Sequence, residues 1–227
     1  FELTNDEINT MNAAIKADTN LSKLIGLFGE PVDLYKQYKI NLWRADSIWN
    51  HDQQTIKKFK DPGTTRRFEM IPLIDWFTSD ESFIGEAGVS YLIKTDEATI
   101  LFDLGLNAKE EDPSPLQKNM ARLGIKPDDI DIIVISHNHS DHVGGDKWEE
   151  KNTFSFTNYQ PPLKQIPVYV PVEMTYPGLN PVCTPQPTKI ARGVTTIGVI
   201  HNPVFFADIG EQAIAVNVEN KGIVIIS

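Results

Sequence analysis

Short apolar runs that are typical of β-strands fill the chain from Phe68 onward. Between the third and fourth runs, Leu116, Met120 and Leu123 recur at helical spacing, which predicts a helix. Gly124 follows as a stop signal for that helix. The runs read FEMIPLI, VSYLIKT, ATILFDLG, DIDIIVIS, IPVYVPV, VTTIGVI, AIAVNV and GIVIIS. Strand runs that are interrupted by a helix predict an α/β fold.

Residues 1–66 have a different pattern, and we expect them to form a helical N-terminal extension. Thr4 and Glu7 have the spacing of a capping box, and Ile8 opens an apolar stripe at helical intervals. Two more apolar stretches, 21–28 and 34–49, favour further helix. We expect the aromatic side chains of this extension to pack on the main domain, residues 67–227.

The run from Ile130 to Ile135 is almost continuously apolar, as in a strand that is buried on both faces. Histidines begin directly after it, at the end of a strand where α/β proteins commonly place their chemistry. In contrast, four prolines between Tyr176 and Thr188 predict a loop.

The composition describes a globular protein with an acidic surface. Of the 227 residues, 41% are hydrophobic, which is enough for a sizeable core. Asp and Glu number 31 against 21 Lys and Arg, and the net charge is -10. Such a charge repels phosphate backbones, so we expect a small-molecule substrate and no nucleic-acid partner. The single cysteine, Cys183, excludes an internal disulfide.

Localisation stays open on sequence grounds. No apolar run approaches the roughly 20 residues that a membrane span requires. The chain begins at Phe1 without an initiator methionine, so we expect that an upstream segment has been removed. The cytoplasm, and export or anchoring through that segment, are both compatible with these observations.

Three of the five histidines lie within six positions, in the stretch VISHNHSDHVGG. His137 and His139 are separated by one residue, so in an extended segment both side chains project to the same side and can share a cation. Asp141 and His142 follow within reach of a second cation. These ligands suit Zn²⁺, and Mn²⁺ or Fe is compatible with them. The pattern predicts a dinuclear metal site; the alternative, a solvated loop rich in histidine, requires a cluster that is rare by chance.

The stretch SHNHSDHVGG resembles the signature of the metallo-β-lactamase-fold hydrolases. GVSYLIKTDEATILFDLG is similar to the strand pair that precedes this signature, and LGIKPDDIDIIVISHNHSDHVGG fits the helix, strand and metal loop. EQAIAVNVENKGIVIIS, with PLID at Pro72 to Asp75, resembles one branch, the dihydropterin ribofuranosyl-aminobenzene phosphate synthases. The resemblance implies an αββα sandwich over residues 67–227 whose C-terminal part is missing.

The resemblance also implies roles for five residues. His137 and His139 would bind the first metal, and Asp141 and His142 would bind the second. Asp103 would accept a hydrogen bond from a ligand histidine. In the family, a hydroxide that bridges the metals attacks an ester, lactone, amide or phosphate-type centre while the cations polarise its oxygen. Asp141 is expected to take up the proton.

The chain departs from the family near its C-terminal end. Family members supply further metal ligands from segments after the strand that GIVIIS resembles, whereas this sequence stops at Ser227. His201 is the one histidine downstream of the motif, and its place ahead of EQAIAV predicts a structural or pocket-wall residue and not a ligand. GIVIIS is an apolar run with no charged or turn-forming residue to close it, which is typical of an interior strand, so we expect the polypeptide to continue past Ser227.

The sequence thus predicts a metal-dependent hydrolase, with two zinc ions, that acts on a small molecule. One alternative follows the branch resemblance: a transferase that condenses a pterin with a phosphoribosyl-bearing substrate. That reaction needs an anion pocket, and the basic residues after residue 68 form no strong cluster beyond Lys164, Lys189 and Arg192. The other alternative is a non-catalytic metal-binding module of the same fold.

Overall fold

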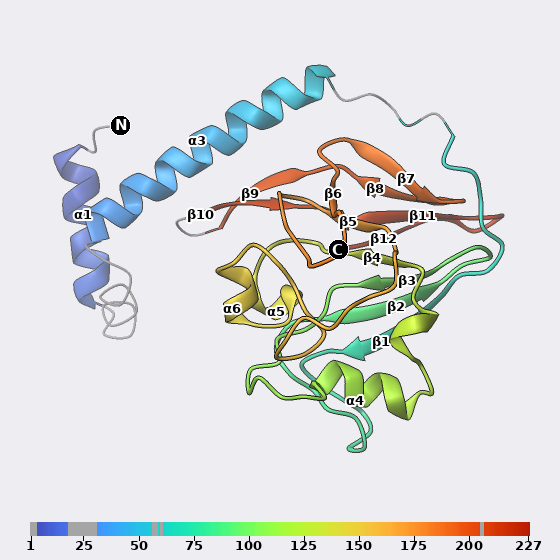
Figure 1. The fold of residues 1–227 in the computed structure, drawn as a ribbon. Helices are drawn as coiled ribbons and strands as arrows, with labels where there is room; N and C mark the ends of the chain where they lie inside the picture. Colours follow the sequence, from blue (N-terminus) through green and yellow to red (C-terminus); the bar gives the residue numbers. More distant parts are fainter. Residues whose placement is uncertain (1–3, 18–30, 56–58, 60, 205–206) are drawn as a thin grey trace. The chain divides into compact units, whose positions relative to one another are not determined.

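The computed structural model describes residues 4–17, 31–55, 59, 61–204 and 207–227 (Figure 1). The chain divides into two compact units. The first comprises residues 1–56 and 201–209, and the second comprises residues 57–200 and 210–227. The domain boundary expected near residue 66 stays a prediction, and each unit is described by itself below.

The first unit contains the helices α1 (Asn5–Ala17) and α3 (Pro31–Thr55) and most of the hairpin formed by β9 (Ile200–Val204) and β10 (Ala207–Glu211). The capping box predicted for α1 is present, since Thr4 N donates to Glu7 Oε2 at 3.0 Å and Glu7 N donates to Thr4 Oγ1 at 3.3 Å. The helical extension is confirmed for the described residues. The helix predicted over 21–28 lies outside them, and the packing of the aromatics on the main domain stays a prediction.

The second unit contains two sheets and four short helices. Its strands are β1 (Glu69–Ile74), β2 (Ser90–Lys94), β3 (Thr99–Phe102), β4 (Ile132–Val134), β5 (Val168–Val170), β6 (Val182–Cys183), β7 (Pro187–Ala191), β8 (Val194–Ile197), β11 (Ile214–Val218) and β12 (Gly222–Ile226). Its helices are α4 (Pro115–Arg122), the 3₁₀-helix η1 (Pro127–Asp129), α5 (Ser140–Val143) and α6 (Asp146–Glu149).

The six-stranded sheet has the order β1-β2-β3-β4-β5-β6. Its first three strands are antiparallel neighbours, and β3, β4, β5 and β6 run parallel. The second sheet, β12-β11-β8-β7, is antiparallel throughout. Figure 1 shows the two sheets of this unit stacked on one another, with α4 on the far side of the six-stranded sheet.

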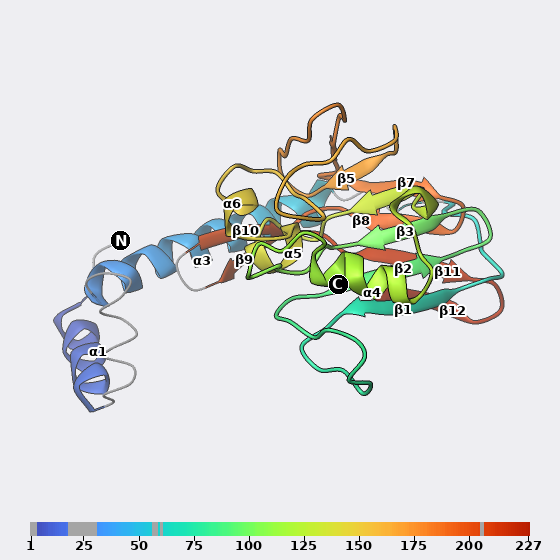
Figure 2. The ribbon, with the colours of Figure 1, turned by 60° about the horizontal axis from the view of Figure 1, so that its bottom comes forward.

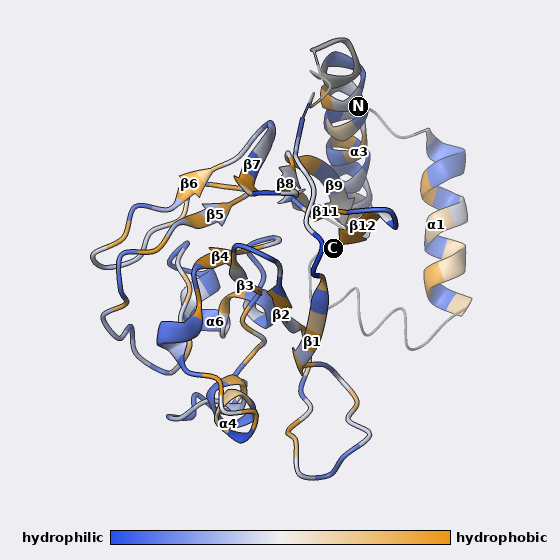
Figure 3. Cartoon of the chain, turned by 90° about the vertical axis from the view of Figure 1, so that its right-hand side faces the viewer, coloured by the Kyte–Doolittle hydropathy of each residue, from blue (hydrophilic) through white to orange (hydrophobic). Residues whose placement is uncertain are grey.

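Alternating side chains of the six-stranded sheet build two cores. Leu92 and Leu101 point to the face that packs against α4, where Leu116 and Met120 are buried. Ile93, Ile100 and Phe102 point to the opposite face and meet side chains of the four-stranded sheet. The apolar members of that second set are Val194, Ile214, Val216 and Ile226. In Figure 3 the strands β4, β5 and β6 carry hydrophobic colouring while many surrounding loops are hydrophilic.

Helix α4 confirms the helix predicted between the third and fourth strands, and Figure 2 shows it lying against the β1–β3 part of the sheet. Its start is a capping box that the sequence analysis missed: Gln117 N donates to Ser114 Oγ at 3.2 Å, and Ser114 N donates to Gln117 Oε1 at 3.0 Å. Its end is followed by Gly124 in the left-handed region, as predicted.

The mixed α/β fold class is confirmed, and three layers of the expected αββα sandwich are present in the described part of the second unit. The fourth layer would cover the outer face of the four-stranded sheet. On that face the side chains of Ile223 and Ile225 in β12 are 68% and 65% exposed. β12 is the edge strand of its sheet among the described residues, and the expectation that the fold continues past Ser227 stays a prediction.

The proline-rich segment is mostly irregular, as predicted, although it contains the two-residue strand β6 and the first two residues of β7. None of the described helices combines the length and the apolar character needed to cross a membrane.

Candidate metal centre

The histidine motif follows β4 at the carboxyl end of the parallel part of the sheet. Ile135 N donates to Tyr169 O at 3.0 Å, which extends the ladder to the residue before Ser136. The chain then turns into the short helix α5, whose first residue, Ser140, donates its backbone N–H to Glu149 Oε2 at 2.7 Å. A buried strand and a fixed helix start hold this loop at both ends.

Three of the four predicted ligands converge. His137, Asp141 and His142 each offer a ligand atom, and these atoms lie within 4.8 Å of one another. His142 Nε2 lies 3.6 Å from Asp141 Oδ2. His139 is not a member of this group, although its ring centroid lies 4.7 Å from that of His137. The geometry suits one cation held by three residues, with a third imidazole, that of His139, beside them.

Asp103 lies at the end of β3 and is fully buried. Its carboxylate accepts hydrogen bonds from Ser136 N at 2.7 Å, from Ser136 Oγ at 2.6 Å and from His142 Nδ1 at 2.8 Å. Because Nδ1 of His142 is engaged, Nε2 is the nitrogen that faces Asp141. The family resemblance implied that Asp103 accepts a hydrogen bond from a ligand histidine; the hydrogen bond from His142 is present, and the role of His142 as a ligand stays a prediction.

Ser136 links the carboxylate of Asp103 to both histidines, a role that the sequence analysis missed. Its Oγ lies 2.9 Å from His137 Nδ1 and 3.3 Å from His142 Nδ1. Since the single hydroxyl hydrogen goes to Asp103, the hydroxyl accepts from His137 Nδ1–H, which leaves Nε2 of His137 with its lone pair. A serine between a buried strand and the first histidine is the only sequence signal of this role.

The two central histidines differ in their preferred charge. Burial, together with the neighbouring His142 and His139, lowers the pKa of His137 to about 3. Burial also lowers the pKa of His142, but its hydrogen bond to Asp103 and the charges of Asp103, Asp141 and Glu211 outweigh burial and raise it. Thus His137 is held in the neutral form that metal binding requires, whereas the protonated form of His142 is favoured in the metal-free protein and would have to lose its proton when a cation binds.

Two further segments, around Gly88 and Gln212, contact the histidine motif. Gly88 lies so close to it that an added Cβ would be 1.9 Å from Asp141 O. Gln212, which is 2% exposed, donates its backbone N–H to Ser136 O at 2.8 Å and its Nε2 to Ile135 O at 2.7 Å. Sequence reasoning did not find Gln212, because nothing local distinguishes it from other polar residues before a strand.

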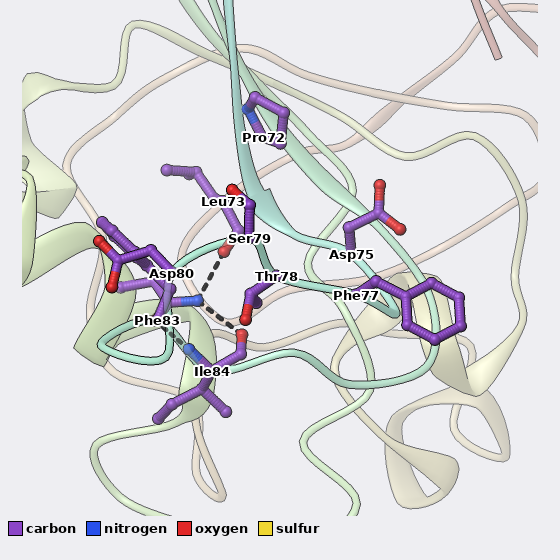
Figure 4. A pocket seen from close by; sticks show the side chains of 10 residues that line it. Pro72, Leu73, Asp75, Phe77, Thr78, Ser79, Asp80, Phe83 and Ile84 are labelled. Atoms are coloured by element: carbon purple, nitrogen blue, oxygen red, sulfur yellow. Dashed lines mark hydrogen bonds between the residues drawn. The ribbon is translucent and has the colours of Figure 1, made fainter.

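A separate cavity of about 350 Å³ lies at the end of β1 (Figure 4). It is lined by Pro72, Leu73, Asp75, Phe77, Thr78, Ser79, Asp80, Phe83, Ile84 and Asn119. Asn119 Nδ2 donates to Leu73 O at 2.7 Å and to Ile84 O at 2.8 Å, which ties the two ends of the intervening loop together. None of the lining residues belongs to the histidine motif, so this cavity is distinct from the metal centre.

A family model matches the segment that contains this geometry. Residues 84–153 match the model of the metallo-beta-lactamase superfamily, and the match includes Asp103, Ser136 and the histidine motif. The chain carries a metallo-beta-lactamase superfamily segment. The resemblance predicted from the sequence is thereby confirmed.

Curated relatives of the metallo-beta-lactamase segment have several activities. The chain is 37% identical over 75 residues to the 7,8-dihydropterin-6-methyl-4-(beta-D-ribofuranosyl)-aminobenzene-5'-phosphate synthase of Methanocaldococcus jannaschii, over 31% of this chain and 24% of that protein. It is 36% identical over 61 residues to the exodeoxyribonuclease WalJ of Streptococcus pneumoniae, over 27% of this chain and 21% of that protein. It is 35% identical over 74 residues to the N-acyl homoserine lactonase AiiB of Agrobacterium fabrum, over 24% and 27%.

The chain spans about a quarter of the length of these curated relatives. Among solved structures, a quorum-quenching N-acyl homoserine lactone lactonase is 20% identical, with 71% of this chain and 72% of that chain covered and a TM-score of 0.43. The predicted kinship with metallo-beta-lactamase superfamily hydrolases, and with the dihydropterin branch, is confirmed by these relatives.

Members of the metallo-beta-lactamase superfamily typically bind zinc, and the donor set fits such an ion. The set consists of two imidazoles and one carboxylate, which are ligand types of catalytic zinc sites. Hydrogen bonds hold the Nδ1 atoms of both imidazoles. His201 lies on β9, in the unit that does not hold the motif, so its place as a pocket residue stays a prediction. The exclusion of nucleic acid also stays a prediction.

Proposed function

We propose that this chain carries the metal-binding part of a zinc-dependent hydrolase that acts on a small-molecule ester, lactone, amide or phosphate-type substrate. The observation that carries the proposal is the convergence of His137, Asp141 and His142 within 4.8 Å, with both imidazoles oriented from behind by Asp103 and Ser136. Bound divalent cations, two in the proposed site, supply Lewis acidity and lower the pKa of water toward neutrality.

The protein's own groups have separate roles in this proposal. His137 and His142 offer Nε2 to the metal site, with His139 beside them for a second ion. Asp141 contributes a carboxylate that is partly exposed, so one oxygen can receive the proton that the attacking water loses. Asp103 stays behind the histidines and holds them in one tautomer, because its carboxylate is fully buried and saturated with donors.

The first experiment measures metal binding by the full chain. Calorimetric titration of metal-free protein with zinc should show tight binding, and His137→Ala should abolish it. Glu150→Gln, at an exposed carboxylate directly after α6, serves as the control and should bind zinc as the parent does. A parent protein that binds no zinc would contradict the proposal.

The second experiment is a hydrolysis panel on zinc-loaded protein with N-acyl homoserine lactones, simple esters, phosphodiesters and single-stranded DNA. We expect turnover of a small-molecule substrate that Asp141→Asn removes. Turnover of DNA alone would favour the activity of the exodeoxyribonuclease relative. Zinc binding without any turnover would favour the non-catalytic module.

A second candidate is the pterin condensation, and the specific observation in its favour is the 37% identity to the dihydropterin synthase of Methanocaldococcus jannaschii. It would be recognised by the joint consumption of a dihydropterin and a phosphoribosyl-bearing substrate. Turnover of this pair without turnover of the hydrolysis panel would replace the hydrolase proposal.

A further inference from the structure

Two chain segments contact the short helix α5, which carries two of the predicted metal ligands. In the first segment, residues 104–107 after β3, Leu104 N donates to His142 O at 3.0 Å. Gly105 O in the same segment accepts from Gly144 N at 2.9 Å, directly after the last residue of α5. Because α5 has only four residues, these two hydrogen bonds fix the position of its C-terminal end.

The second segment, residues 86–89 before β2, approaches α5 closely. A Cβ on Gly88 would lie 1.9 Å from Asp141 O, so no side chain fits between this segment and the helix at that point. The two segments are also joined to each other, since Gly105 N donates to Val89 O at 3.1 Å. A shift of either segment would therefore displace the backbone that carries a predicted ligand.

The side chain of Glu86 links the two segments at a second point. Its Oε1 accepts hydrogen bonds from Leu106 N at 3.1 Å and from Asn107 N at 3.0 Å. Its backbone N–H donates to Asp75 O at 3.1 Å, so the start of the segment before β2 is itself held at the end of β1. One oxygen of a half-buried side chain that accepts from two consecutive N–H groups fixes the distance between the segments, two residues ahead of Gly88.

We propose, building on the proposed metal-dependent function, that Glu86 is a positioning residue for Asp141 and His142. It is not a member of the group of ligand atoms that converges within 4.8 Å among the described residues, so it acts through the backbone and not as a ligand. The length of its side chain sets the separation of the two segments, and this separation sets where α5 presents its ligands. The acceptor oxygen carries this role, and the charge does not, because both donors are neutral backbone N–H groups.

The test is a zinc titration of the full chain and of two variants at residue 86. Glu86→Asp keeps the charge but shortens the side chain by one carbon, so its oxygen reaches both N–H groups only if the segments move. Glu86→Gln keeps the length and the acceptor oxygen and loses the charge. We expect Glu86→Asp to raise the zinc Kd by at least about tenfold and Glu86→Gln to leave it within about threefold of the parent value.

The matched control is Glu69→Asp, which makes the same shortening at an exposed carboxylate on β1. The partner of Glu69 is the side chain of Arg67, at 2.7 Å, and not a backbone group, so the zinc Kd should be unchanged. Urea unfolding of the metal-free proteins shows which variants are folded under the titration conditions. Sucrose in all titrations favours the folded state of a destabilised variant, so that every affinity is measured on folded protein.

A second readout uses Co²⁺ as the probe, because its visible absorption depends on the geometry of the atoms that bind it. The cobalt spectrum of Glu86→Asp should differ from that of the parent, whereas Glu86→Gln and Glu69→Asp should match the parent. Equal zinc affinities and cobalt spectra for Glu86→Asp and Glu69→Asp would overturn the role of Glu86 alone, even if Glu86→Asp lowers the urea midpoint, provided that His137→Ala abolishes binding. A tenfold loss of affinity in Glu86→Gln would also overturn it. A parent chain that binds neither metal would overturn this role and the proposed function together.

Discussion

The buried carboxylate of Asp103 accepts three hydrogen bonds from two residues, Ser136 and His142. Its backbone has a φ of 59°, in the left-handed region that aspartate and asparagine tolerate better than most residues. Its backbone carbonyl accepts from Ser90 Oγ at 2.8 Å, so neighbouring strand β2 also holds it in place. One side chain thus sets the path of the loop and the direction of an imidazole.

Asp103→Asn is expected to raise the zinc Kd by about 10- to 100-fold. Asparagine tolerates the backbone conformation and keeps the volume, so the loss reports the missing charge and the missing acceptor for His142 Nδ1. The control is Asp131→Asn at the opposite end of β4, where the carboxylate accepts from Thr99 N at 2.9 Å. Calorimetric titration of both variants measures the difference, and equal affinities would argue against an orienting role for Asp103.

Glu86 should make the stability of the metal-free protein depend on pH. Burial raises the pKa of this carboxyl, although its hydrogen bonds from the backbone N–H groups of Asn107 and Leu106 oppose the shift. Because the folded pKa lies above the unfolded value, the contribution of Glu86 to stability is complete below the unfolded value. It is lost as pH rises through the folded pKa.

Glu86→Gln removes this titration while its side-chain oxygen still accepts the two backbone N–H groups. Urea unfolding from about pH 4 to about pH 7 should show the variant gaining stability relative to the parent as pH rises. Glu150→Gln, at an exposed carboxylate directly after α6, serves as the control and should show no such trend. A constant difference between Glu86→Gln and the parent across this range would show that Glu86 does not titrate as described.

At the scale of elements, the site depends on how closely the segment before β2 approaches the histidine motif. Gly88 has a φ of 84°, and a Cβ at this position would lie 1.9 Å from Asp141 O. Gly124, after α4, has a φ of 70° and open space around it. The two glycines therefore share a backbone conformation and differ in what surrounds them.

Gly124→Ala should cost about 1 kcal/mol, the strain of a left-handed backbone alone. Gly88→Ala should cost clearly more and should also weaken zinc binding, because the methyl group must displace the backbone of Asp141. Urea unfolding and zinc titration of the two variants measure both effects. If the two substitutions cost the same and zinc binding is unaffected, the close approach at Gly88 has no role in the site.

Strands with regular apolar runs could be predicted from the sequence, and those without them could not. β2, β3 and β4 are buried inside the six-stranded sheet, and their continuous apolar runs reflect this. β6 and β7 each lie at a sheet edge beside prolines, so their sequences read as a loop. The hairpin of β9 and β10 was also missed, since the predicted run VTTIGVI reaches only the first residue of β9 and no predicted run covers β10.

At the scale of the whole molecule, local spacing determined which parts of the site could be predicted. The histidine motif is contiguous, so its chemistry is visible in the sequence. Gln212 meets Ile135 across 77 positions, and only the folded chain brings them together. The same holds for Ser136, whose role depends on Asp103 at the end of another strand.

The overall charge of -10 predicts the class of substrate less well than the residues of the candidate site do. It led us to expect no nucleic-acid partner, yet an exodeoxyribonuclease is among the relatives of the matched segment. A net charge sums over the whole surface, whereas a substrate meets only the charges near the metal. The hydrolysis panel with DNA therefore decides a point that composition does not.

The bond from Gln212 N–H to Ser136 O makes one backbone amide a reporter of the metal loop. That amide hydrogen can exchange with solvent only when the junction before β11 separates from the end of β4. A ligand that binds only the closed arrangement slows such opening in proportion to its occupancy. Hydrogen–deuterium exchange at Gln212 would then follow zinc occupancy at the histidines, although the amide itself contacts no ligand atom of the metal.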